Sequence, residues 1–240
     1  MPQTTPQVKV MATRAFGANV VLFGETVADA YEEAERIAHE EGRVFVHPYD
    51  DRDVIAGQGS VGLEMIEDGP AFDAVVVPIG GGGLISGMAL AFAGHAPATE
   101  VVGVETALYP AMWSVLTGEA RPCGGPTLAE GIAVRDVGTL TTQIVRQLVP
   151  SIALVDETAL ERAVNALLMH QKTLAEGAGA AGLAALLADP DRFRGKTVGL
   201  VISGGNIDPR MLAGILLREL EREERIVSFR LTILDRPGML

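Results

Sequence analysis

A run of four glycines at residues 80–83 is the feature that most constrains the fold of this chain. It follows an apolar segment, 73–79, that is typical of a buried strand, and it precedes an apolar segment, 84–90, that is typical of a helix. Without side chains, the glycine N–H groups can converge on an anion at the helix N-terminus, where the helix dipole favours negative charge. The run has neither the Walker pattern nor Gly-x-Gly-x-x-Gly spacing. We therefore expect a phosphate site, with a flexible glycine turn as the alternative.

Strand-like and helix-like segments alternate along the rest of the chain, which favours an α/β fold with a doubly wound sheet. The apolar strands lack clean alternation, which is typical of a parallel sheet covered on both faces. Strands are expected at 19–23, 43–46, 73–79, 100–104, 152–155 and 197–202. Helices are expected at 31–38, 53–66, 84–90, 156–174, 178–187 and 209–221.

Local signals refine several of these elements. Thr26 and Asp29 form the pattern of a capping box before the helix at 31–38. Three glycines within 53–66 predict a helix that is interrupted, and they indicate close packing or a neighbouring ligand. The last stretch, 226–234, alternates like an edge or antiparallel strand and leads into a turn, so it resembles the start of another domain.

Composition excludes several classes of function. The chain has 240 residues, of which 48% are hydrophobic, so it can bury the core of one large or two smaller domains. Its net charge of −12, without a basic stripe, argues against nucleic acid and anionic membranes as partners. The apolar runs are short and interrupted by glycine, so we expect no membrane span. Cys123 is the one cysteine, which excludes an internal disulfide and fits a reducing cytosol, while His39, His47, His95 and His170 lack metal-ligand spacing.

A second glycine-rich turn, 203–206, follows the strand expected at 197–202. Ligands of doubly wound sheets bind at the carboxyl ends of the strands, where both glycine-rich turns are expected. The hydroxyl of Ser203 could donate a hydrogen bond to an aromatic nitrogen, and a turn or capping serine is the alternative. The two turns could therefore bracket one cofactor.

These motifs resemble the fold-type II pyridoxal-phosphate family, and within it the threonine dehydratases, with serine racemases as close relatives. The resemblance implies the tryptophan synthase β-like fold, truncated here at both ends. Residues 1–46 would be the later part of the small subdomain, 47–224 the large cofactor domain, and 225–240 the first strand of an ACT-type regulatory domain. The matching segments, in family order, are 1–6, 9–18, 47–48, 54–59, 77–84, 103–105, 128–134, 176–180 and 203–206.

The resemblance also implies roles for individual residues. Ser203 would bond the pyridine nitrogen, and this neutral partner suits β-elimination because it leaves the nitrogen largely unprotonated. Glu176 would lie near the ring edge of the cofactor and Glu130 on the substrate side, with a solvated carboxylate as the alternative for each. Backbone N–H groups would bind the phosphate of pyridoxal 5′-phosphate at Gly80, Gly81, Gly82, Gly83 and Leu84.

Two departures from the family pattern stand out. The motif with the Schiff-base lysine has no counterpart here, and the lysines present, Lys9, Lys172 and Lys196, lie outside it, so no catalytic residue is assigned and half a site is expected. Some relatives hold a metal ion at positions matching Glu105, the Tyr109 carbonyl and residue 111. Alanine stands at position 111, so Glu105 is a weak candidate and no tight divalent ion is expected.

By resemblance, the whole enzyme is a lyase that converts L-threonine and L-serine to a 2-oxo acid and ammonia, in isoleucine biosynthesis or serine/threonine catabolism. A serine racemase is the closest alternative, and an inactive fragment is the non-enzyme alternative. The expected partner is a small amino acid, the expected compartment is the cytoplasm, and the full-length form is expected to be a homo-oligomer.

Overall fold

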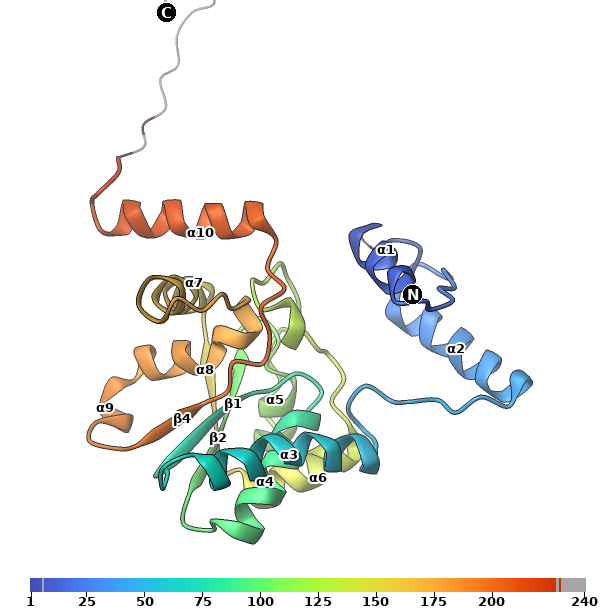
Figure 1. The fold of residues 1–240 in the computed structure, drawn as a ribbon, viewed down its shortest axis with the longest axis horizontal. Coiled ribbons are helices and arrows are strands. Elements are labelled where there is room, and N and C mark those ends of the chain that lie inside the picture. The colour runs from blue at the N-terminus through green and yellow to red at the C-terminus, as the bar shows by residue number, and fades with distance from the viewer. Residues whose placement is uncertain (6, 228, 230–240) are drawn as a thin grey trace, which may run out of the picture. The chain divides into compact units, whose positions relative to one another are not determined.

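A computed structural model describes residues 1–5, 7–227 and 229. The chain divides into two compact units, Met1–His47 and Pro48–Leu240. Both glycine-rich turns lie in the second unit, whose elements are coloured from cyan to red in Figure 1. None of the described helices is both long enough and apolar enough to cross a bilayer.

The second unit is built on a four-stranded sheet in the order β3-β2-β1-β4, with every pair parallel. In the centre, Val76 lies opposite Val102 on one side and Leu200 on the other. The parallel α/β sheet expected from the apolar runs is therefore confirmed. The strands are β1 (Ala74–Pro78), β2 (Glu100–Thr106), β3 (Ser151–Val155) and β4 (Val198–Leu200).

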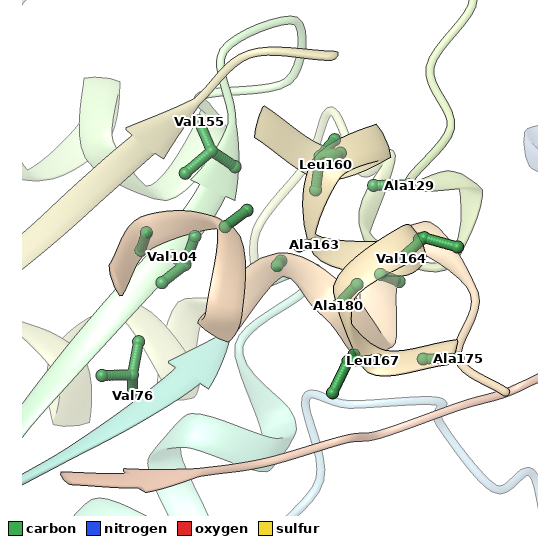
Figure 2. Packing of buried hydrophobic residues seen from close by; sticks show 14 of the residues in the cluster. Val76, Val104, Ala129, Val155, Leu160, Ala163, Val164, Leu167, Ala175 and Ala180 are labelled. Atoms are coloured by element: carbon green, nitrogen blue, oxygen red, sulfur yellow. The ribbon is translucent and has the colours of Figure 1, made fainter. Parts of the chain in front are cut away.

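Helices cover both faces of the sheet, which explains why β1 is apolar at every position. Val75 and Val77 pack into the core on one face, and Val76 packs into the core on the other. Figure 2 shows Val76 in this second core together with Leu160 and Ala163, which both belong to the helix 157–166. The first face carries α3 (Arg52–Asp68), α4 (Gly83–His95), α5 (Ala111–Thr117) and α6 (Thr139–Leu148); the second carries α7 (Glu157–Ala166), α8 (Gly177–Ala188) and α10 (Pro209–Arg222).

Two helices differ from their predicted forms. The prediction of an interrupted helix within 53–66 is wrong, because α3 is continuous from Arg52 to Asp68. Its glycines allow α4 to pack at close range. A side chain at Gly87 of α4 would meet the Ile55 carbonyl at 2.3 Å. The helix that begins after Asp156 was expected to reach residue 174, but α7 passes into a π-helical turn, Leu167–Gln171, and ends at Lys172, whose φ of 57° is left-handed.

The first unit contains α1 (Gln7–Ala15) and α2 (Val27–Glu41). The predicted capping box is confirmed, because the Thr26 hydroxyl accepts the Asp29 N–H at 3.1 Å and the Asp29 carboxylate accepts the Thr26 N–H at 2.9 Å. The strands expected at 19–23 and 43–46 are wrong, since both segments are irregular in this structure. Neither segment pairs with a strand among the described residues, and an isolated strand is not stable in water.

The remaining predicted element lies at the C-terminus of the chain. The strand expected at 226–234 falls almost entirely outside the described residues, and so does the expected start of another domain.

Candidate functional site

The glycine run 80–83 joins the end of β1 to the start of α4. Gly82 is the N-cap of α4 with a left-handed φ of 97°, and its carbonyl accepts the first helical hydrogen bond, from the Ser86 N–H at 3.0 Å. Within the described residues, no backbone acceptor takes the N–H groups of Gly80, Gly83 or Leu84. Free donors at a helix N-terminus attract an anion, so this end of α4 offers what the sequence predicted for a phosphate.

Each glycine of the run also lies against a packed neighbour. A side chain at Gly81 would meet Cγ of the Tyr49 ring at 2.2 Å, and one at Gly83 would meet the Tyr49 Cα at 3.0 Å. At Gly82 a side chain would meet the Met112 Cε at 2.8 Å. The sequence explained these glycines by the approach of an anion, whereas in this structure Tyr49 occupies the space beside two of them.

Tyr49 and Asp50 link the glycine run to the turn before α6. The Tyr49 hydroxyl donates to the Asp136 carbonyl at 2.8 Å, and burial of the ring raises the pKa of that hydroxyl. The Thr141 hydroxyl donates to the Gly81 carbonyl at 2.8 Å. The Asp50 carboxylate accepts the N–H groups of Thr139, Leu140 and Thr141 at 2.9, 2.9 and 3.1 Å. Sequence reasoning missed these residues, because the contacts join positions 60 to 91 residues apart.

The second glycine-rich turn begins just beyond β4, where Ser203 is exposed. The Glu176 N–H donates to the Gly204 carbonyl at 3.1 Å. A side chain at Gly204 would meet the Glu176 carboxylate at 2.4 Å. Glu176 is the N-cap of α8 but makes no capping bond with its side chain, so its carboxylate lies beside the turn instead.

A third segment lies beside the two glycine-rich turns and completes the candidate cluster of the glycine run, Glu176 and the Ser203 turn. It is a short 3₁₀ helix, Glu130–Ile132, in which Glu130 is exposed. A side chain at Gly131 would meet a Glu176 carboxylate oxygen at 3.2 Å, and one at Gly80 would meet the Gly131 carbonyl at 3.4 Å. The structure therefore brings the glycine run, the Glu130 segment, Glu176 and the Ser203 turn together at the carboxyl ends of β1 and β4.

The Glu105 side chain caps the start of α5 and does not face an open site. Its carboxylate is 1% exposed and accepts the N–H groups of Met112 and Trp113 at 2.8 and 2.9 Å. Burial raises the pKa of Glu105 to about 7. Ala111 offers no side-chain ligand, and in the described part of the chain no three His, Cys, Asp or Glu side chains cluster as a metal site.

The two lysines of the second unit make their polar contacts with other residues than those of the glycine run. Lys196 precedes β4, so it lies toward the amino end of the strand that Ser203 follows, and its Nζ is 3.9 Å from Glu100. Lys172 is exposed, and its Nζ donates to the Met169 carbonyl at 2.7 Å. Neither lysine contacts the glycine run.

Comparison with known proteins identifies the family of the chain. Residues 1–204 match the family described as pyridoxal-phosphate dependent enzyme. The chain belongs to this family.

Three similar proteins are named for reactions of threonine or serine. The L-threonine ammonia-lyase of Thermotoga maritima is 46% identical over 242 residues, which cover 100% of this chain and 60% of the relative. The processed form of threonine deaminase isoform 2 from Solanum lycopersicum has a TM-score of 0.83 at 33% identity, over 90% of this chain and 61% of that one. Maize serine racemase has a TM-score of 0.81 at 32% identity, over 93% and 70%. The chain thus spans about three fifths of the length of the first of these relatives.

Proposed function

We propose that this chain supplies the phosphate-binding part of a pyridoxal-phosphate dependent threonine ammonia-lyase. The observation that carries the proposal is the set of N–H groups at the start of α4, next to the Ser203 turn and the Glu176 carboxylate. The identity of 46% with a threonine ammonia-lyase over the whole chain supports the substrate class. The whole enzyme would convert L-threonine and L-serine to a 2-oxo acid and ammonia.

The residues at the cluster fit the cofactor. The N–H groups of residues 80–84 would hold its phosphate, because they are donors without a backbone acceptor at the positive end of a helix. Ser203 would donate to the pyridine nitrogen from the exposed turn after β4, and Glu176 would border the ring. When bound, pyridoxal phosphate supplies the electron sink for loss of an α-proton and a β-hydroxyl.

The remaining residues would act on the substrate side and in orientation. Glu130, exposed on its short helix, would face the amino acid, where a carboxylate can hold a proton. Glu105 would hold the start of α5 by its two N–H bonds and would not bind a metal ion. No lysine of the second unit contacts the glycine run in this structure, so we assign no catalytic residue within the chain.

A racemase is the second candidate, because the fold is similar to maize serine racemase at a TM-score of 0.81. The two reactions begin with loss of the same α-proton and differ in whether the β-hydroxyl leaves. An inactive partial chain is the third candidate. The assignment of 1–46 to a small subdomain, 47–224 to the cofactor domain and 225–240 to an ACT-type domain is part of the proposal, as are a cytoplasmic location, a homo-oligomeric full-length form and the absence of nucleic-acid or membrane partners.

Two experiments test the proposed function. In the first, equilibrium binding of pyridoxal phosphate and of pyridoxal to the chain is compared, and we expect tighter binding of the phosphate form. In the second, the chain is joined to the part of the Thermotoga maritima relative that lies outside the match. This chimera should form 2-oxobutanoate from L-threonine.

The outcomes separate the three candidates. Formation of D-serine from L-serine in excess of pyruvate would favour the racemase. A folded chimera with neither activity would favour the inactive chain, and equal affinity for pyridoxal and its phosphate would contradict the phosphate site.

A further inference from the structure

We propose that Asp50 and Tyr49 are positioning residues that hold the glycine run in its anion-binding shape before any ligand arrives. The inference rests on the proposed function and extends it to residues outside the two glycine-rich turns. Both residues belong to the segment that leads into α3, far along the chain from residues 80–84. Their contacts reach the run by two separate routes.

The first route passes through the turn before α6. The Asp50 carboxylate takes three successive N–H groups there, Leu140 and Thr141 on one oxygen and Thr139 on the other. This fixes the N-terminus of α6, because the three N–H groups would otherwise lack partners. The fit is close, since a side chain at Gly138 would meet the Asp50 oxygen at 2.1 Å.

The turn that Asp50 holds is also hydrogen-bonded to the glycine run. The Thr141 hydroxyl and the Gly138 N–H both donate to the Gly81 carbonyl, at 2.8 and 3.3 Å. One carbonyl with two donors is fixed in direction, and so is the peptide plane that carries the Gly82 N–H. Asp50 therefore acts on the run through the turn, without touching the run itself.

The second route is direct packing. The Tyr49 ring lies where side chains at Gly81 and Gly83 would otherwise point, and its hydroxyl is tied to the Asp136 carbonyl at 2.8 Å. Glycine is the most flexible residue of the backbone, so four in succession need outside contacts to keep one shape. Tyr49 on one side and the Thr141 turn on the other supply those contacts.

A positioning role makes a specific prediction about the phosphate. The ratio of the dissociation constants of pyridoxal and pyridoxal phosphate isolates the contribution of the phosphate group. For the chain with Asp50→Ala, we expect this ratio to fall at least tenfold, with the constant for pyridoxal changed less than twofold. Asp50→Asn keeps one acceptor oxygen, the amide carbonyl, and should recover part of the ratio. Tyr49→Phe removes the bond to the Asp136 carbonyl and should lower the ratio about threefold.

Asp51→Ala is the matched control. Asp51 is the adjacent carboxylate and also caps a helix, because it accepts the Asp53 and Val54 N–H groups of α3 at 2.8 and 3.0 Å. The hydrogen bonds of Asp51 lie at the start of α3, away from the run and from the turn before α6, so its loss should weaken a helix cap yet leave the ratio unchanged.

Amide hydrogen exchange gives a second readout that needs no cofactor. In Asp50→Ala, exchange of the amides of residues 80–86 should accelerate at least tenfold, while that of residues 100–106 in β2 should stay as in the wild type. An unchanged ratio and unchanged exchange in a folded Asp50→Ala chain would overturn the positioning role alone. A wild-type chain without any preference for the phosphate form would overturn the phosphate site, and this inference with it.

Discussion

The glycines of the run 80–83 do not all face the same neighbour, so one added methyl group has different consequences along the run. Gly81 faces the Tyr49 ring, Gly82 has a left-handed φ of 97°, and Gly80 lies beside Val134. Glycine is required here for packing and for backbone conformation, as well as for the approach of a ligand.

Gly81→Ala tests the packing requirement. The new methyl carbon would lie 2.2 Å from the Tyr49 Cγ, so the ring has to move. We expect the dissociation constant of pyridoxal phosphate to rise at least tenfold and the free energy of unfolding to fall by about 1–3 kcal/mol. Gly94→Ala, within α4 and with nothing within 4 Å of the new carbon, is the control and should stabilise the chain by roughly 0.5–1 kcal/mol. Equal affinity in the two variants would mean that the run is only a turn.

Ser203→Ala tests the second cofactor contact. Loss of one hydrogen bond should weaken binding of pyridoxal phosphate by about 1 kcal/mol, which is roughly fivefold in the dissociation constant. In the chimera, Ser203→Asp should favour a protonated ring nitrogen and raise α-proton exchange relative to 2-oxobutanoate formation. The measurement is the ratio of these two rates on L-threonine in both variants. A ratio equal to that of wild type in both would show that Ser203 does not contact the ring.

Among the elements, α5 depends on a buried carboxylate at its start. Pro110 is its N-cap and offers no side-chain acceptor, so Glu105 reaches from β2 to the N–H groups of Met112 and Trp113. The helix has only seven residues and therefore needs such a contact more than a long helix does.

The raised pKa of Glu105 predicts how stability depends on pH. Its ordinary value is 4.5 and burial raises the pKa to about 7, so the folded state binds the proton more tightly than the unfolded state. The resulting stability is present in full below pH 4.5 and is lost as the pH rises through 7. Relative to Glu105→Gln, the free energy of unfolding of the wild type should fall by on the order of 3 kcal/mol over this range.

Denaturant unfolding at a series of pH values measures this difference. Glu64→Gln, at an exposed position of α3, controls for the change in net charge. A difference between wild type and Glu105→Gln that stays constant from pH 4.5 to 8 would contradict the burial of a protonated carboxyl.

For the molecule as a whole, the positions of the lysines predict reversible binding of the cofactor. Lys172 and Lys196 make their polar contacts outside the glycine run, so we expect no amine of the second unit beside a phosphate bound there. Treatment of the chain and pyridoxal phosphate with borohydride should therefore attach the cofactor to no single lysine in stoichiometric amount. Peptide mass spectrometry after reduction is the measurement, and stoichiometric labelling of Lys172 or Lys196 would contradict the proposed site.

Local patterns predicted several elements of both units correctly. The apolar runs at β1 and β2 specify buried parallel strands, and Thr26 with Asp29 specifies the start of α2, because these signals act within a few residues. The segments 19–23 and 43–46 have the same composition as strands but are irregular, since a strand also needs a neighbour with which to exchange hydrogen bonds. The unbroken course of α3 likewise depends on α4, which fills the space beside its glycines.

The sequence by itself determined the α/β class, the parallel sheet and the family, because hydrophobic period, glycine-rich turns and motif order are all read along the chain. Only the tertiary structure decided what surrounds the glycine run. Asp50, Tyr49 and Thr141 are ordinary polar residues, and their hydrogen bonds to the run, to each other or to the turn before α6 span 60 to 91 residues of the chain. By resemblance Glu105 is a weak metal candidate, yet its carboxylate is bonded to the first turn of α5. Hydrogen-bond partners of this kind follow from where the folded elements meet, which no local pattern records.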